Sequence, residues 1–219
     1  MAESPSISGS NFRSVDRAYT EIVVVRHGET EWNAVGRIQV AARLSREPKI
    51  SAVYSSDLKR ALETAETIAA CCGGLEVIKD ANLWERHLGD LQGLVLREAA
   101  KVSPNAYQAF LSHRTNQVIP GGGESLDQLY QRSTSALQRI ARKHRGERVV
   151  VVTHGGVIRA LYRRACPNNK PAGKVLNTSI NVFHLFDGDK WTVKIWGDVS
   201  HLDETEYLAS GFGGDRTSG

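Results

Sequence analysis

Four consecutive valines, Val149–Val152, constrain the fold more than any other feature of this sequence. An uninterrupted β-branched run of this length is typical of a strand buried on both faces. A second such run, Ile22–Val25, lies near the N-terminus. Both runs lie among segments with helical periodicity, and strands that alternate with helices imply an α/β fold whose sheet is largely parallel. We therefore predict a mostly parallel central sheet with helices on both faces.

The remaining elements are read from periodicity and from turn residues. Asp57 is expected to cap a helix that ends at Gly73-Gly74, and Ser125–His144 has the pattern of a long amphipathic helix. We also expect a helix at Val40–Glu47, strands at Ile50–Tyr54 and Leu75–Ile78, one or two helices among the loops of residues 80–123, a helix from Gly155 to about Ala165, and a hairpin of Asn181–Leu185 and Trp191–Trp196. Residues 19–205 are predicted to form a single domain, between a disordered leader (1–18) and a flexible tail (206–219).

Composition excludes several classes of function. The 219 residues carry a net charge of +4, and the 28 basic residues are spread along the chain rather than gathered in a stripe that would suggest nucleic-acid binding. The apolar runs are too short to span a membrane. Three cysteines, two of them adjacent, do not form a secreted disulfide framework, and the N-terminus lacks an apolar signal core. A cytoplasmic location is therefore expected.

Each of the two buried strands is followed directly by a histidine. Arg26-His27-Gly28 follows the first valine-rich run, and His154-Gly155 follows the second. Because ligands of such sheets bind beyond the carboxyl ends of the strands, we expect His27 and His154 to meet at one edge. A neutral histidine is a competent phosphoryl acceptor, and a neighbouring arginine can clamp phosphate oxygens. The arrangement predicts phosphoryl chemistry.

The segment Arg26-His27-Gly28-Glu29-Thr30, continued by Trp32 and Asn33, resembles the signature of the histidine phosphatase superfamily, also called the phosphoglycerate-mutase-like family. Further blocks resemble the family in its order, and the likeness covers about residues 20–205. They are Tyr54–Ala61 with Thr64-Ala65, the group Leu83, Glu85, Arg86, Gly89 and Gly93, the segment Pro120–Leu126, and Val151–Gly156.

The resemblance implies a role for each matched residue. It makes His27 the nucleophile, Glu85 the proton donor and His154 a third catalytic residue, expected to be protonated. The implied phosphate pocket consists of Arg26, Asn33, Arg60, His154 and Gly155. Glu85 would start protonated, give its proton to the departing alkoxide and then act as base on the water that cleaves phosphohistidine. Neither a metal nor another cofactor is required by this chemistry.

The chain departs from the family after Gly36-Arg37-Ile38-Gln39. Relatives continue with a loop that lines the substrate pocket and with the start of a long helix, whereas this chain passes directly to Val40-Ala41-Ala42. About two dozen family residues are therefore expected to be missing, as after an internal deletion.

Three functions stay open at the level of sequence. The residues Trp84–Gly93 resemble the phosphatase branch, and most closely the plant phosphoglycerate-mutase-like proteins, which favours a phosphomonoester hydrolase acting on a small phosphorylated metabolite. The alternatives are a mutase primed by 2,3-bisphosphoglycerate and a non-catalytic protein that binds phosphorylated metabolites. The sequence does not decide between a monomer and a homodimer.

Overall fold

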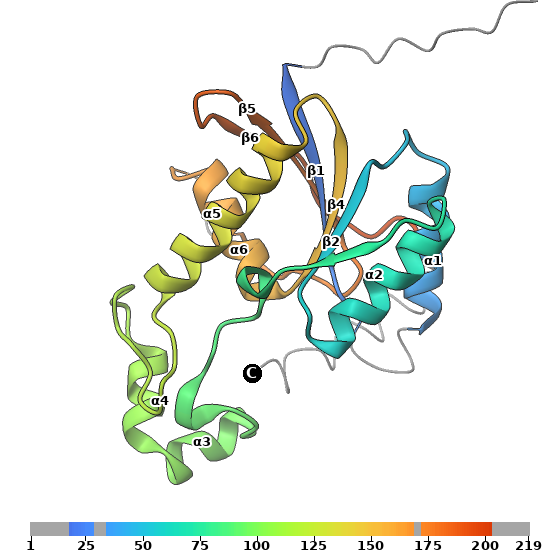
Figure 1. Cartoon of the computed structure of the whole chain (residues 1–219). Helices are drawn as coiled ribbons and strands as arrows, with labels where there is room; N and C mark the ends of the chain where they lie inside the picture. The colour runs from blue at the N-terminus through green and yellow to red at the C-terminus, as the bar shows by residue number, and fades with distance from the viewer. Residues whose placement is uncertain (1–17, 29–33, 169–171, 203–219) are drawn as a thin grey trace, which may run out of the picture.

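A six-stranded sheet forms the centre of the computed structural model, which describes residues 18–28, 34–168 and 172–202 (Figure 1). The strand order is β3-β2-β4-β1-β5-β6. The pairs β1/β4, β2/β4 and β2/β3 are parallel, and β1/β5 and β5/β6 are antiparallel. The predicted mostly parallel sheet is confirmed. The strands are β1 (Tyr19–Arg26), β2 (Ala52–Ser55), β3 (Val77–Lys79), β4 (Arg148–Thr153), β5 (Ile180–Phe186) and β6 (Trp191–Asp198).

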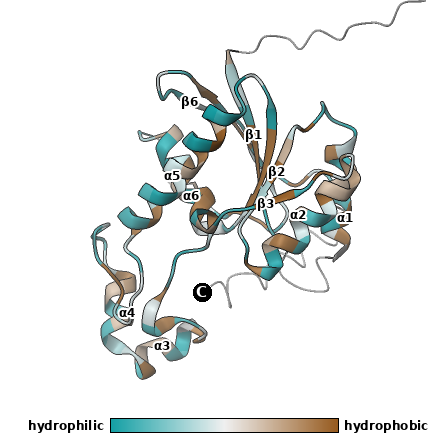
Figure 2. Ribbon diagram, in the orientation of Figure 1, coloured by the Kyte–Doolittle hydropathy of each residue, from teal (hydrophilic) through white to brown (hydrophobic). Residues whose placement is uncertain are grey.

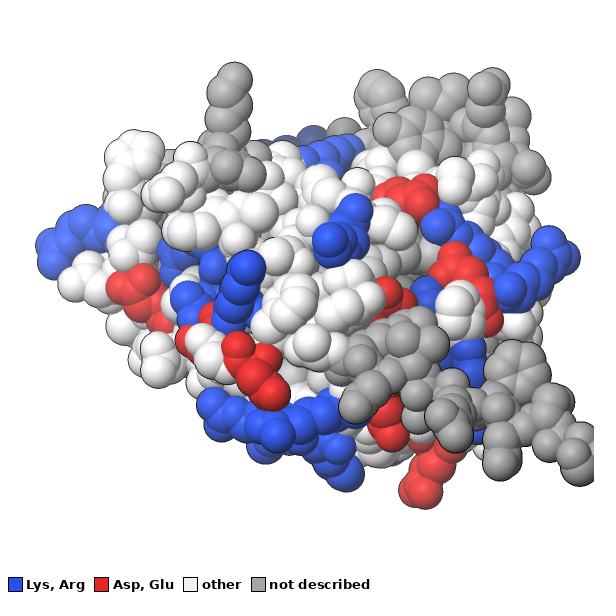
Figure 3. Space-filling model, turned by 90° about the horizontal axis from the view of Figure 1, so that it is seen from above, with Lys and Arg blue, Asp and Glu red and all other residues white. Residues whose placement is uncertain are grey.

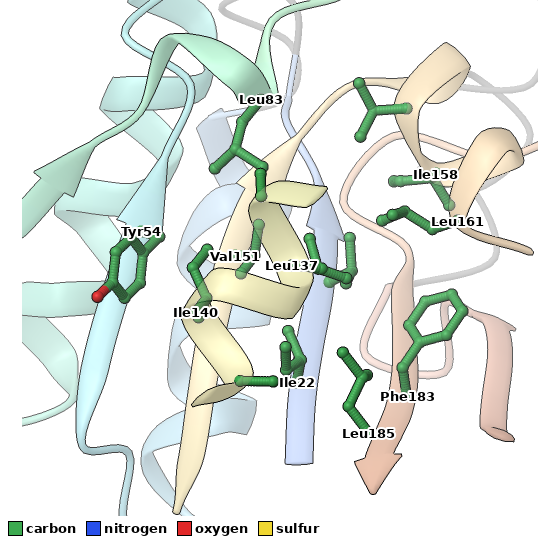
Figure 4. Packing of buried hydrophobic residues seen from close by; sticks show 14 of the residues in the cluster. Ile22, Tyr54, Leu83, Leu137, Ile140, Val151, Ile158, Leu161, Phe183 and Leu185 are labelled. Atoms are coloured by element: carbon green, nitrogen blue, oxygen red, sulfur yellow. The ribbon is translucent and has the colours of Figure 1, made fainter. Parts of the chain in front are cut away.

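Helices cover both faces of the sheet because successive strand side chains point to opposite sides. On one face, α1 (Ala34–Ser45) and α2 (Lys59–Cys71) pack on a cluster that includes Val23, Val25 and Val150. On the other, α5 (Leu126–Lys143) and α6 (Gly155–Ala165) pack on a cluster with Ile22 and Val151. Figure 4 shows this second cluster, and Figure 2 shows hydrophobic residues concentrated along the central strands. The three-layer architecture is as predicted.

Helix α1 differs from the prediction. The sequence predicts a loop from Arg26 to about Gln39 and a helix over Val40–Glu47. In the structure α1 has 12 residues and begins at Ala34. Val40 and Leu44 are buried in the core as their spacing requires. Arg37, in the first turn of α1, forms an ion pair with Glu63 of α2 at 2.5 Å. Periodicity alone did not reveal this tie, because charged residues do not contribute to an apolar pattern.

The start of helix α2 differs from the prediction, and its end agrees with it. Asp57 does not cap the helix, since the N-cap position is Leu58 and has no side-chain hydrogen bond. The Asp57 carboxylate instead accepts a hydrogen bond from the Trp84 indole. At the other end Gly73 adopts a φ of 100°, which favours glycine and stops the helix as predicted.

The long helix α5 begins with a capping arrangement at Ser125. The Ser125 hydroxyl accepts from the backbone N–H of Gln128 at 3.1 Å, and the Gln128 side chain accepts in return from the backbone N–H of Ser125 at 2.8 Å. Such a capping box satisfies two N–H groups that the helix itself leaves without partners. It fixes where α5 begins.

The middle of the chain forms a lobe beside the sheet (Figure 1). It contains the short helices η3 (Gly89–Leu91), α3 (Leu96–Val102) and α4 (Pro104–Leu111). The preceding short helix η2 (Ala81–Leu83) lies against the main core instead, where Leu83 is buried. A small separate core of Leu91, Ala99, Ala106 and Ile119 holds the lobe together. The one or two predicted helices correspond to α3 and α4, and the short 3₁₀ helices η2 and η3 were not predicted.

Other predicted segments fall at the margins of the structure. The leader (1–18) and the tail (206–219) lie outside the described residues, apart from Ala18. No helix among residues 18–28, 34–168 and 172–202 has the length and apolar character needed to cross a bilayer.

Figure 3 views the end of the molecule that is uppermost in Figure 1, where basic and acidic side chains are interspersed.

Candidate active site

The carboxyl ends of β1 and β4 bring the two predicted histidines together. These strands are parallel neighbours, with Arg26 opposite Thr153, and the backbone N–H of His27 donates to the Thr153 carbonyl at 3.0 Å. The ring centroids of His27 and His154 are 4.8 Å apart, with 58° between the ring planes. Both residues are buried, with exposed fractions of 1% and 0%. One phosphoryl group can therefore contact both imidazoles.

Hydrogen bonds define the protonation of His27. Its Nδ1 lies 3.2 Å from the Gly28 carbonyl, so Nδ1 carries the proton and donates. Its Nε2 accepts a hydrogen bond from Arg60 Nε at 3.2 Å, which requires a lone pair on Nε2. Burial above all, and then the charges of Arg60 and Arg26, lower the pKa of His27 to about 3, against an opposing effect of the Gly28 carbonyl. At neutral pH the ring is uncharged and Nε2 is nucleophilic.

Two arginines supply positive charge at this edge. The guanidinium of Arg60, from the first turn of α2, bonds His27, and its Nη2 is a buried donor without a hydrogen-bond partner among the described residues. Arg26 is also buried, and its Nη1 donates to the Val175 carbonyl at 2.5 Å. Buried guanidinium groups attract phosphate oxygens, because their planar donors match the geometry of the anion.

His154 corrects one expectation. It occupies the N-cap position of α6, and its Nε2 lies 2.9 Å from the Ser56 hydroxyl. Burial, followed by the charges of His27, Arg60, Arg26 and Arg132, lowers the pKa of His154. The predicted protonated form is therefore disfavoured in this structure, because positive groups surround a desolvated ring. An anionic phosphoryl group would counter this effect.

Glu85 lies at the start of α6, next to His154. Its Oε2 accepts from the backbone N–H of Gly156 at 3.0 Å, and its Oε1 accepts from the backbone N–H of Arg86 at 2.8 Å. The preceding residues are tied to β4, because the Thr153 hydroxyl donates to the Leu83 carbonyl at 2.6 Å. The structure thus gathers His27, His154, Arg26, Arg60 and Glu85 at one sheet edge, as the sequence predicted.

The other predicted pocket residues have different outcomes. Gly155 is the buried first residue of α6, directly after His154. Asn33 lies outside the described residues, as do Glu29, Thr30 and Trp32. Within the described part of the chain, no group of three or more His, Cys, Asp or Glu side chains could hold a metal ion.

A cavity of about 560 Å³ lies elsewhere, between the start of β1, the end of α5 and the hairpin turn at Asp187–Asp189. The predicted site residues do not line it. The chemistry assigned to the histidines therefore does not involve this cavity.

Sequence reasoning missed Arg132 and Ser56. The Ser56 hydroxyl bonds His154, and the half-buried Arg132 bonds the backbone that carries Glu85. Arg132 lies three residues after the buried Leu129, so helical spacing places it beside the buried face of α5. A charged residue so placed needs partners, and this is the signal that could have found it.

The lowered pKa of His27 predicts a loss of stability in acid. An unfolded His27 regains a pKa near 6.5, so the unfolded state binds the proton first as the pH falls. The contribution of His27 to the free energy of unfolding is complete above pH 6.5 and declines between pH 6.5 and 3. At pH 5 about 2 kcal/mol should be lost through this residue. Urea unfolding at pH 7.5 and pH 5 measures the loss, and His27→Asn should remove this share. An equal loss in the variant would contradict the prediction.

Comparison with known proteins identifies the family. A sequence profile described as the histidine phosphatase superfamily (branch 1) matches residues 22–199. Phosphoglycerate mutase-like protein 4 of Arabidopsis thaliana is 64% identical over 227 aligned positions, covering 96% of this chain and 99% of the relative. These positions outnumber the 219 residues of the chain, so the relative contains residues that this chain lacks.

Other relatives are phosphatases by name or share the fold. The metal-independent phosphoserine phosphatase of Arabidopsis thaliana is 52% identical over 218 positions, covering 92% of this chain and 91% of the relative. The solved structure of Bacillus stearothermophilus YhfR is 31% identical with a TM-score of 0.70, covering 84% of this chain and all of that one. A mycobacterial glucosyl-3-phosphoglycerate phosphatase, solved with inorganic phosphate, is 27% identical with a TM-score of 0.66, covering 84% and 99%. The predicted family, fold and phosphatase class are confirmed, and the chain belongs to branch 1 of the histidine phosphatase superfamily.

Proposed function

We propose that this protein hydrolyses the phosphomonoester of a small metabolite through a phosphohistidine formed on Nε2 of His27. The observation that carries the proposal is the geometry at Nε2. This atom carries the lone pair of the ring, which accepts a hydrogen bond from Arg60 Nε at 3.2 Å that the substrate must displace. The ring centroid lies 4.8 Å from that of His154. A neutral nucleophile beside buried guanidinium groups suits attack on a phosphorus that carries negative charge.

The reaction divides into two displacements. First, the lone pair of His27 Nε2 forms a bond to phosphorus while the bond from phosphorus to the ester oxygen breaks. The leaving oxygen takes the electron pair of that bond and a proton from Glu85. Arg26 and Arg60 stabilise the charge on the phosphoryl oxygens. Water then attacks phosphorus while Glu85 accepts a proton from it. The bond from phosphorus to Nε2 breaks, its electron pair returns to Nε2, and inorganic phosphate departs with His27 neutral again.

O-phosphoserine is the substrate that we propose first. A relative 52% identical to this chain is named a metal-independent phosphoserine phosphatase. Phosphoserine phosphatase 1 of Hydrogenobacter thermophilus is 34% identical over 159 positions, covering 65% of this chain and 74% of the relative. Serine is a poor leaving group unless it is protonated, so this substrate needs the proton that Glu85 would supply.

One assay tests the proposal against the alternatives. The protein is incubated with O-phosphoserine, 3-phosphoglycerate or 4-nitrophenyl phosphate, with and without 2,3-bisphosphoglycerate and in the presence of a chelator. We expect release of inorganic phosphate that needs neither 2,3-bisphosphoglycerate nor a metal ion. Exchange between phosphoglycerate isomers without net release would instead indicate a mutase, and binding of phosphate without turnover would indicate a non-catalytic protein.

We propose the cytoplasm as the location of this reaction. Cys71, Cys72 and Cys166 are free thiols in the structure, which suits a reducing compartment. A small phosphorylated metabolite is the proposed partner, with no role for nucleic acid or a membrane.

A further inference from the structure

The guanidinium of Arg132 makes five hydrogen bonds, all around the segment that carries Glu85. Nε and Nη2 donate to the two carboxylate oxygens of Glu124 at 2.6 and 2.8 Å. Nη1 donates to the carbonyls of Asn82 and Trp84, each at 2.9 Å. Nη2 also donates to the Glu85 carbonyl at 3.0 Å. The side chain therefore connects α5 to three backbone positions within four residues.

Glu124 binds both Arg132 and the backbone that follows Glu85. Its Oε2 accepts from the backbone N–H of His87 at 3.0 Å, two residues after Glu85. Burial would raise the pKa of Glu124, but the hydrogen bonds from Arg132 and the His87 backbone outweigh it, and the pKa is lowered. The carboxylate is thus ionised beside Arg132. With exposed fractions of 21% and 19%, the two side chains are shielded enough for a two-bond ion pair to stay in place.

The segment needs this support because it has no regular structure of its own. Residues 84–88 belong to no helix or strand. The Glu85 carboxyl must nevertheless stay against the first turn of α6, where it accepts from Gly156. A misplacement of about 1 Å in a catalytic group can cost about 10²-fold in rate, so side chains that fix the backbone have a direct effect on the reaction.

We propose that Arg132 and Glu124 are a positioning pair that holds the Glu85 carboxyl at the place where it gives its proton to the leaving oxygen. The inference rests on the proposed function and deepens it. Neither side chain contacts the reacting atoms, and both act mainly through Glu85, since the charge of Arg132 is the smallest of the effects on His154. Their effect should therefore appear chiefly where the reaction needs a proton donor.

Leaving groups separate this role from a general structural one. Serine leaves as a strongly basic alkoxide and needs a proton, whereas 4-nitrophenolate leaves without one. The measured quantity is kcat/KM, which includes the steps up to departure of the leaving group and excludes hydrolysis of the phosphohistidine. Arg132→Gln should lower kcat/KM for O-phosphoserine by about 10²-fold and for 4-nitrophenyl phosphate by less than about threefold. Glu124→Gln, which keeps the shape and removes the charge, should show a smaller loss with the same selectivity.

A double-mutant cycle tests whether the effect passes through Glu85. If it does, Arg132→Gln should cost little more in a Glu85→Gln background, because the group that it positions is already gone. Arg142→Gln serves as the matched control, since Arg142 is exposed on the last turn of the same helix and should leave both rates unchanged.

An equal loss for both substrates, or full additivity with Glu85→Gln, would overturn the positioning role. If Arg132→Gln does not fold by circular dichroism, the selectivity of Glu124→Gln decides the question. Failure of the proposed function gives a different result, since the unmodified protein would then hydrolyse neither substrate.

Discussion

The His27→Ala substitution is expected to lower kcat/KM for O-phosphoserine and for 4-nitrophenyl phosphate alike, by about 10⁴-fold or more. In the proposed mechanism His27 forms the bond to phosphorus in the first step, so its removal affects every substrate regardless of the leaving group. Arg26 and Arg60 would still bind phosphate, so binding should survive the loss of turnover.

Rapid-quench labelling gives the direct measurement. The unmodified protein should form a phosphoenzyme that is stable in alkali and labile in acid, as phosphohistidine is, and the variant should form none. His113→Ala is the control, because His113 is an exposed histidine in the lobe, outside the sheet edge that carries the site. Activity within tenfold of the unmodified protein in His27→Ala would exclude His27 as the nucleophile.

The sequence predicted that His27 and His154 meet, because the ends of buried strands can be recognised from their apolar runs. The apolar runs that precede His27 and His154 identify two buried strands, and the parallel register of those strands then brings residues 127 positions apart to the same edge. The hydrophobic pattern alone did not identify Arg60 and Glu85 as site residues. Their positions came from the family resemblance, and the structure supplied the contacts that place them beside the histidines.

The features that the sequence did not reveal depend on polar contacts between distant segments. Arg37 near the start of α1 forms an ion pair with Glu63 of α2, and Arg132 of α5 bonds the backbone of Glu85. Asp57 has the composition of a helix cap but bonds the Trp84 indole instead. Apolar periodicity reports which face of an element is buried, and it carries no information about which polar groups will meet there.

The Gly156→Ala substitution is expected to separate stability from activity. Gly156 lies in the first turn of α6, where alanine favours the helix by about 0.5–1 kcal/mol over glycine. A Cβ at this position would overlap Oε1 of Glu85. The atom in the way is the end of a flexible side chain, so the fold can adapt by moving the Glu85 carboxyl. That movement breaks the hydrogen bond that Gly156 donates to Oε2, and it takes the proton donor out of position.

The expected result is a melting temperature that is unchanged or slightly raised, with kcat/KM for O-phosphoserine lowered by about 10²-fold. Thermal unfolding followed by circular dichroism gives the first quantity and initial rates of phosphate release give the second. In a Glu85→Gln background the same substitution should cost little further activity, because the displaced carboxyl no longer acts as an acid. A variant as active as the unmodified protein would show that Glu85 does not need its bond to α6. A lowered melting temperature would show that the backbone, and not the carboxyl, gives way to the new methyl group.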